Sequence, residues 1–225
     1  GVSIGRGAGD VATNTVVGNN ALDANTTGNQ NTAIGDRTLT SNTTGNGNTS
    51  VGKDAGAALT TGSLNTFIGR SAGDSQTTAD SNVAIGNAAL TNNTTGSGLV
   101  AVGGEALQKN TASNNTAVGY QALEENITGY NNTAVGSLAL TDNTGNNNTA
   151  VGKNALKVTT SGGQNTAVGT SALDANTTGG SNTAVGYDAL TANTTANNNT
   201  AVGYNSLLAN TTGTQNTAVG SDALD

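Results

Sequence analysis

Carboxylates, a few basic side chains and many Asn and Thr residues are the groups in this sequence that could carry chemistry. The chain contains no His and no Cys, which removes the commonest general bases, nucleophiles and metal ligands. Glu124 and Glu125 form the only adjacent acidic pair, and we assign them to a solvated turn. A calcium-binding roll needs an Asp at one position of every repeat, whereas Asp is scattered here, as at Asp23, Asp36, Asp142, Asp174 and Asp188. We therefore predict no catalytic site, no metal site and no cofactor.

Three related segments carry a basic residue close to an acidic one. They read RGAGD at 6–10, KDAGA at 53–57 and RSAGD at 70–74. In each, a Gly (Gly9, Gly56 or Gly73) stands where neighbouring segments have Leu. An exposed Arg–Asp pair at a turn contributes at most about 1 kcal/mol to stability. We interpret these segments as variant coils with a reshaped turn rather than as a binding patch.

The most regular polar group is an Asn that precedes a Thr two residues later. It fits the acceptor pattern for N-glycosylation. Glycans on every acceptor would crowd one another if the acceptors were stacked about 4.8 Å apart. A stacked Asn ladder at a turn explains the same residues without modification. Both interpretations stay open for Asn25, Asn42, Asn93, Asn126, Asn176, Asn193 and Asn210.

The elements that must position these groups come from an internal repeat. The Gly that closes each NTAVG-like segment recurs from Gly5 to Gly220, at a spacing of 17 residues ten times, 16 twice and 13 once. The unit is N-T-A-V-G-x-x-A-L-x-x-N-T-T-G-x-x, whose positions we number 1 to 17. A fixed short period is the signature of a solenoid whose units stack on one another. We treat 1–225 as a single array, with variant coils in 1–81 and regular coils in 82–225.

A unit of this length is too short for a helical hairpin, and its Gly and β-branched residues oppose helix. We predict an all-β parallel β-solenoid of about 13 coils, each with two short strands and two turns. The first strand is T-A-V and the second contains A-L. Because side chains alternate along a strand, we expect Thr and Val on one face and Ala on the other.

We assign the larger residues to the core. The predicted core contains a Val column and a Leu column: Val118, Val135, Val151, Val168, Val185, Val202, Val219, Leu123, Leu140, Leu156, Leu173, Leu190 and Leu207. One Val and one Leu per coil, at roughly 1.5–3 kcal/mol each when buried, barely offset the conformational entropy of the coil. We therefore expect several chains to associate through the small residues of the opposite face, Ala117, Ala134, Ala150, Ala167, Ala184, Ala201 and Ala218.

Composition and charge limit the classes of partner. The formal net charge is −7 and no basic stripe occurs, so we predict no nucleic-acid binding. No run of about 18 apolar residues occurs, so this segment contains no predicted membrane span. The sequence begins and ends inside a repeat, and we read it as part of a longer array.

The segments SNVAIG (81–86), LVAVG (99–103) and GVSIG (1–5) resemble the head repeats of trimeric autotransporter adhesins. The fuller NTAVGYQAL…NTTG pattern resembles repeats of bacterial and phage proteins described as tail-fibre-like. The resemblance covers essentially the whole chain. It implies a left-handed β-roll, a trimer or higher homo-oligomer, and a location outside the cell, on a cell surface or a virion.

The expected function is structural: the shaft or head of an extracellular fibre that projects a binding tip towards a host-surface glycan or receptor. One alternative is a module whose lateral Thr/Asn face itself binds glycan or ice. Ice-binding solenoids present outward Thr at alternate strand positions, whereas here we place the strand Thr on the same face as a buried Val. A self-assembling surface filament is a third hypothesis.

Overall fold

The structure is a computed structural model that describes residues 4–225. Apart from a short 3₁₀ helix, η1 (Ala8–Asp10), its regular elements in the described residues are β-strands. The chain forms two compact units, the first ending at Asn114 and the second running from Asn115 to Asp225.

Each unit contains one three-residue strand per coil, preceded in the first unit by a two-residue strand. The first unit contains β1 (Ile4–Gly5), β2 (Thr15–Val17), β3 (Thr32–Ile34), β4 (Thr49–Val51), β5 (Thr66–Ile68), β6 (Val83–Ile85) and β7 (Val100–Val102). The second contains β8 (Thr116–Val118), β9 (Thr133–Val135), β10 (Thr149–Val151), β11 (Thr166–Val168), β12 (Thr183–Val185), β13 (Thr200–Val202) and β14 (Thr217–Val219).

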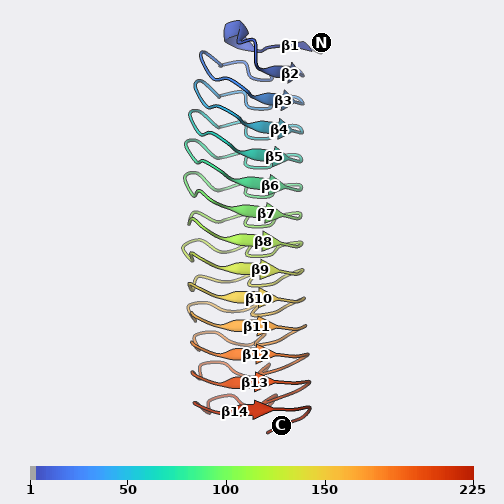
Figure 1. The fold of residues 1–225 in the computed structure, drawn as a ribbon, viewed down its shortest axis with the longest axis vertical. Helices are drawn as coiled ribbons and strands as arrows, with labels where there is room; N and C mark the ends of the chain where they lie inside the picture. The colour runs from blue at the N-terminus through green and yellow to red at the C-terminus, as the bar shows by residue number, and fades with distance from the viewer. Residues whose placement is uncertain (1–3) are drawn as a thin grey trace. The chain divides into compact units, whose positions relative to one another are not determined.

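Within each unit, consecutive three-residue strands pair in parallel with equivalent repeat positions opposite one another. Figure 1 shows β8 to β14 stacked one after another in chain order. Thr166 pairs with Thr183, and Ala167 with Ala184. The exception is β1, which pairs with β2 in antiparallel orientation. The prediction of an all-β parallel β-solenoid is confirmed, with about 12 coils at a spacing of about 17 residues.

The assignment of faces in the first strand was wrong. The middle Ala points into the coil: six of the seven predicted interface residues are 0% exposed and Ala218 is 4% exposed. The predicted core Val lies outside, with 37% of Val168 exposed. The reversal applies to Ala117, Ala134, Ala150, Ala167, Ala184, Ala201 and Ala218 and to Val118, Val135, Val151, Val168, Val185, Val202 and Val219. The reason is space, because the interior already holds a Leu and a second Ala from each regular coil.

The predicted Leu column is confirmed as core. Leu123, Leu140, Leu156, Leu173 and Leu190 are 0% exposed and Leu207 is 3% exposed. The Ala that precedes each Leu is also buried where a regular coil has it, as at Ala172 and Ala189. A regular coil that has both Ala residues and the Leu therefore buries three aliphatic side chains, not the two that we predicted.

The A-L segment does not form the predicted second strand. Leu173 has φ of 54° and Ser171, two residues earlier, also has φ of 54°, in the left-handed region. The segment still bonds to neighbouring coils, since Leu173 N–H donates to the Ala189 carbonyl at 3.0 Å. A left-handed Leu costs roughly 1–2 kcal/mol, and complete burial of its side chain, worth roughly 1.5–3 kcal/mol, offsets that cost.

The Gly after each strand is required by close stacking. Gly169 has φ of 139°, and a β-carbon added there would lie 2.2 Å from the Gly186 carbonyl oxygen of the next coil. Because no other residue lacks a β-carbon, this close approach requires Gly at position 5 of the repeat.

Phe67 explains two of the variant coils of the first unit, those with Gly56 and Gly73 at the Leu position. It replaces the small middle residue of β5 and is 0% exposed. A β-carbon added to Gly56 would lie 2.7 Å from its Cδ2 atom, and one added to Gly73 would lie 2.6 Å from its Cε1 atom. One aromatic ring thus fills the space that two Leu side chains occupy in regular coils.

Candidate functional site

The strands of each unit present an uncharged outer face, which we call the Thr/Val face. In the second unit it consists of Thr116, Thr133, Thr149, Thr166, Thr183, Thr200, Val118, Val135, Val151, Val168, Val185 and Val202. These Thr residues are half-buried, and the Val residues are half-buried or just exposed. Thr and Val alternate at about 6.8 Å along a strand, and neighbouring strands lie about 4.8 Å apart. The face can therefore make a periodic contact with another regular surface.

Behind this face, two columns of Asn amides bind the coils together. At position 1, Asn165 Nδ2 donates to the Gly179 carbonyl at 2.9 Å, and its Oδ1 accepts from the Asn182 backbone N–H at 3.0 Å. At position 12, Asn193 Nδ2 donates to Asn176 Oδ1 of the preceding coil at 2.9 Å. These bonds satisfy buried polar groups, which would otherwise be destabilising.

The second column contains the proposed glycosylation sites, and the structure assigns them to the Asn ladder. Asn126 Nδ2, for example, donates to the Gly129 carbonyl at 2.8 Å. Six of the sites are buried and Asn210 is half-buried. A glycan on the amide nitrogen would displace these bonds, so the folded coil does not accommodate modification at Asn25, Asn42, Asn93, Asn126, Asn176, Asn193 or Asn210.

The predicted Arg–Asp pairs form at only one of the two places. Arg6 and Asp10 approach to 3.5 Å at an exposed turn. Among the described residues, Arg70 and Asp74 form no ion pair; instead Arg37 Nε donates to Asp54 Oδ1 of the next coil at 2.7 Å. An ion pair between coils links two turns, but it contributes little to stability because the Arg37 side chain is 53% exposed.

Two carboxyl groups at position 10 have raised pKa values. Burial raises the pKa of Asp74 above its ordinary value, the Asp54 carboxylate raises it further and the Arg37 guanidinium opposes the change. Burial also raises the pKa of Asp174; the Lys157 ammonium lowers it and the Asp188 carboxylate raises it. The Oδ1 atom of Asp174 is buried without a hydrogen-bond partner. Both carboxylates are therefore less stable in the folded chain than in water.

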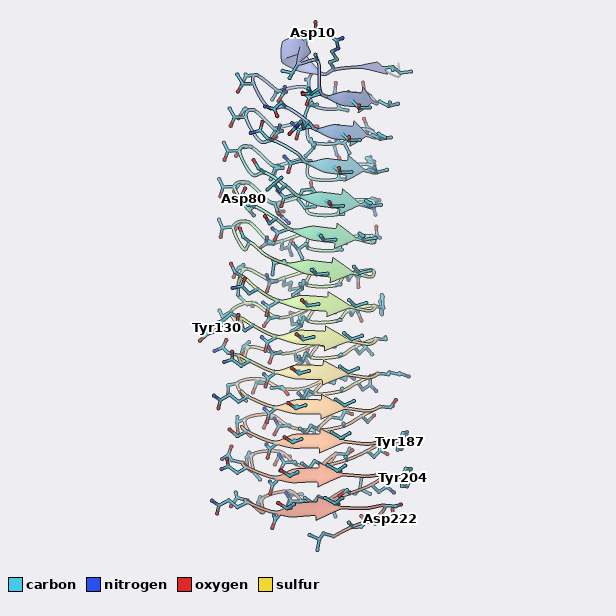
Figure 2. All side chains as sticks on the ribbon, in the orientation of Figure 1. Asp10, Asp80, Tyr130, Tyr187, Tyr204 and Asp222 are labelled. Carbon is cyan, nitrogen blue, oxygen red and sulfur yellow. The ribbon has the colours of Figure 1, made fainter. Side chains whose placement is uncertain are left out.

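A tyrosine pair lies on the turn that follows the strands of the second unit. The Tyr187 and Tyr204 rings stack with centroids 5.5 Å apart, and both project from one edge of the unit in Figure 2. Tyr130 projects from the opposite edge. The spacing of Tyr187 and Tyr204 by one repeat, 17 residues, was the sequence signal for this stack.

The described residues contain no group of three or more His, Cys, Asp or Glu side chains placed to hold a metal ion. Nor does any helix in this part of the chain have the length and hydrophobicity to cross a membrane. Sequence reasoning missed the Thr/Val face, although the exclusive use of Val and Ile at position 4 of the described strands was visible.

Comparisons with protein-family models, curated proteins and solved structures gave no match to this chain.

Proposed function

We propose that this chain is a structural spacer, the shaft or head of an extracellular fibre that holds a binding tip away from a cell surface or virion. The observation that carries the proposal is the register: within each unit, every parallel strand pairs with the next at the same three repeat positions. Each added coil therefore extends a unit by about 4.8 Å without altering the coils beside it. Length is then set by the number of repeats.

Copies of the chain associate, in this proposal, through the Thr/Val face. The Ala column cannot serve because it is buried within its own coil. The strands carry no charged residue, so bringing two such faces together buries no unpaired charge. The resemblance to trimeric adhesin heads favours three chains.

Removal of one complete repeat tests the spacer. Deletion of residues 165–181, which span 17 positions from one Asn to the next, should retain the circular dichroism spectrum and the oligomeric mass. The maximum dimension from small-angle X-ray scattering should fall by about 4.8 Å per deleted repeat. Loss of folding, or a dimension that does not fall with successive deletions, would contradict the proposal.

Ice binding is a second candidate, because the strand Thr and Val both face outwards. One of the two sequence arguments against it, that the strand Thr shares its face with a buried Val, does not hold, because that Val is half-buried or exposed; the other, that the turn Thr residues are adjacent, still applies to the turn. A thermal-hysteresis measurement decides: Thr166→Tyr and Thr183→Tyr together should abolish activity if the Thr/Val face binds ice. The matched pair Thr178→Tyr and Thr195→Tyr, at exposed turn positions, should leave activity unchanged.

A further inference from the structure

Position 16, the second residue before the Asn that begins the next coil, commonly closes a hydrogen-bond ladder along one edge of a unit. Its side-chain oxygen accepts from the backbone N–H at position 16 of the preceding coil. In the first unit Ser63 Oγ accepts from Asn46 N–H at 3.0 Å, and Asp80 Oδ1 from Ser63 N–H at 2.7 Å. In the second, Asn146 Oδ1 accepts from Tyr130 N–H at 2.9 Å, and Asn197 Oδ1 from Gly180 N–H at 2.6 Å.

Gly163 and Gly180 interrupt this ladder in two consecutive coils. Without side chains, they offer no acceptor to the backbone N–H groups of Asn146 and Gly163. Within the described part of the chain, neither of these two backbone N–H groups donates a hydrogen bond. The carbonyl groups of the same two residues remain paired, with Gln164 N–H at 3.1 Å and Ser181 N–H at 3.0 Å. Two donors about one coil spacing apart, roughly 4.8 Å, are thus available to a ligand.

The missing side chains leave a groove of about 430 Å³. Its lining includes the amides of Asn146, Asn147, Gln164, Asn197 and Asn198 and two serine hydroxyls. This volume lies in the range of small-molecule sites. Amides and hydroxyls both donate and accept hydrogen bonds, so the groove matches a ligand that does the same.

Charge and an aromatic neighbour narrow the class of ligand. No charged side chain lines the groove, and the chain carries a net charge of −7, so an anion would gain no ionic partner. Tyr130 occupies position 16 one coil before Asn146, is 48% exposed and projects outwards in Figure 2. A half-exposed ring beside hydrogen-bonding groups suits a ligand with an apolar face and polar edges.

We infer that this groove binds a neutral oligosaccharide, whose oxygens accept from the Asn146 and Gly163 N–H groups while one sugar ring packs on Tyr130. The inference does not depend on the spacer function, since the groove lies within one unit and is lined by residues between the strands, not by residues of the Thr/Val face.

Amide shifts in a ¹H–¹⁵N spectrum test the site. The chain, labelled at Gly and Asn, is titrated with maltotriose and separately with triacetylchitotriose. We expect saturable shifts of the Gly163 and Asn146 amides with at least one saccharide. Unchanged amides with both saccharides, or equal shifts spread over all coils, would overturn the inference.

A filled groove provides the critical variant. Gly163→Asn introduces the residue that Asn146 and Asn197 already supply at this position, and Gly163 has no left-handed φ. The new side chain restores the acceptor for Asn146 N–H and should weaken binding at least about tenfold, or 1.4 kcal/mol. Ser97→Asn, at position 16 of the first unit, is the matched control and should bind as the parent does.

The ring has its own test. Tyr130→Ala should weaken binding about tenfold, whereas Tyr130→Phe keeps the ring and should not. Unaltered affinity in Gly163→Asn would refute the groove, and unaltered affinity in Tyr130→Ala would refute the stacking contact.

Discussion

Phe67 offers the sharpest test of how the coils are packed, because one ring replaces two Leu side chains. Replacing it with Ala restores the usual residue of the middle strand position but leaves Gly56 and Gly73 beside an empty space. A buried Phe→Ala substitution costs roughly 3–5 kcal/mol of stability, because it removes apolar burial and also leaves a cavity. We expect Phe67→Ala to fall in this range, since the side chain is 0% exposed.

The compensating variant follows from the regular coils. Phe67→Ala combined with Gly56→Leu and Gly73→Leu rebuilds three regular positions at once. Both glycines already have left-handed φ, 59° and 61°, close to the φ of the buried Leu residues. The triple variant should be more stable than Phe67→Ala, because burial of two Leu side chains, at roughly 1.5–3 kcal/mol each, exceeds the cost of two left-handed Leu residues, at roughly 1–2 kcal/mol each. Gly73→Leu alone should destabilise, because its β-carbon would approach the ring to 2.6 Å.

The assay must measure the stability of the coils around β5 rather than of the whole chain, because repeat proteins unfold in parts rather than all at once. Hydrogen exchange of peptides that cover β4, β5 and β6 gives the free energy of local opening. If Phe67→Ala loses less than about 1 kcal/mol of protection, or the triple variant is no better protected than Phe67→Ala, the packing argument is wrong.

Three further substitutions test other features of the coil. In a single, unassociated chain, Val168→Lys should change stability by less than about 1 kcal/mol because Val168 is 37% exposed there. Ala167→Lys buries a charge and should prevent that coil from packing; hydrogen exchange over β11 in the unassociated chain separates the two. Asn165→Ala leaves the Asn182 N–H unpaired, whereas the Gly179 carbonyl still accepts from Asn176 Nδ2 at 2.9 Å. The substitution should therefore cost roughly 1–3 kcal/mol, for one unpaired buried group, while Gln164→Ala at the exposed neighbouring position should cost little. The pKa of Asp174 is raised from 3.8 in the folded chain, so the folded state binds more protons than the unfolded state and stability falls as pH rises above that value. Asp174→Asn should therefore melt higher than the parent at pH 7 and no higher below about pH 3.8; equal melting temperatures at both pH values would count against the burial of that carboxylate.

The repeat period was enough to predict the solenoid, because few structures stack a unit as short as 17 residues. The Leu column was equally visible. The faces of T-A-V were not, because alternation shows which residues share a face and leaves open which face is buried. Phe67 held the missing information, since its two compensating glycines place the middle strand position next to the Leu position.

The left-handed Leu was beyond prediction by propensity, as Leu seldom takes positive φ. Gly9, Gly56 and Gly73 at the Leu position were the only hint that this backbone conformation is needed. The Asn ladder was one of two hypotheses for NTT, and the structure decides between them through burial of the amides. The groove at Gly163 and Gly180 could not be predicted, because the effect of two missing side chains depends on which backbone groups they would have met.

The hydrogen bonds between coils have a mechanical consequence. They run from each coil to the next, along the direction in which coils are added, so tension in that direction loads them in series and opens one coil at a time. A released coil of 17 residues lengthens from about 4.8 Å to roughly 55–60 Å. Under tension each unit would therefore yield in steps of about 50–55 Å and rewind when the load falls, since each remaining coil is a template for the next. Single-molecule pulling would display these steps, and a tether of this kind would absorb a sudden load by extension instead of transmitting it.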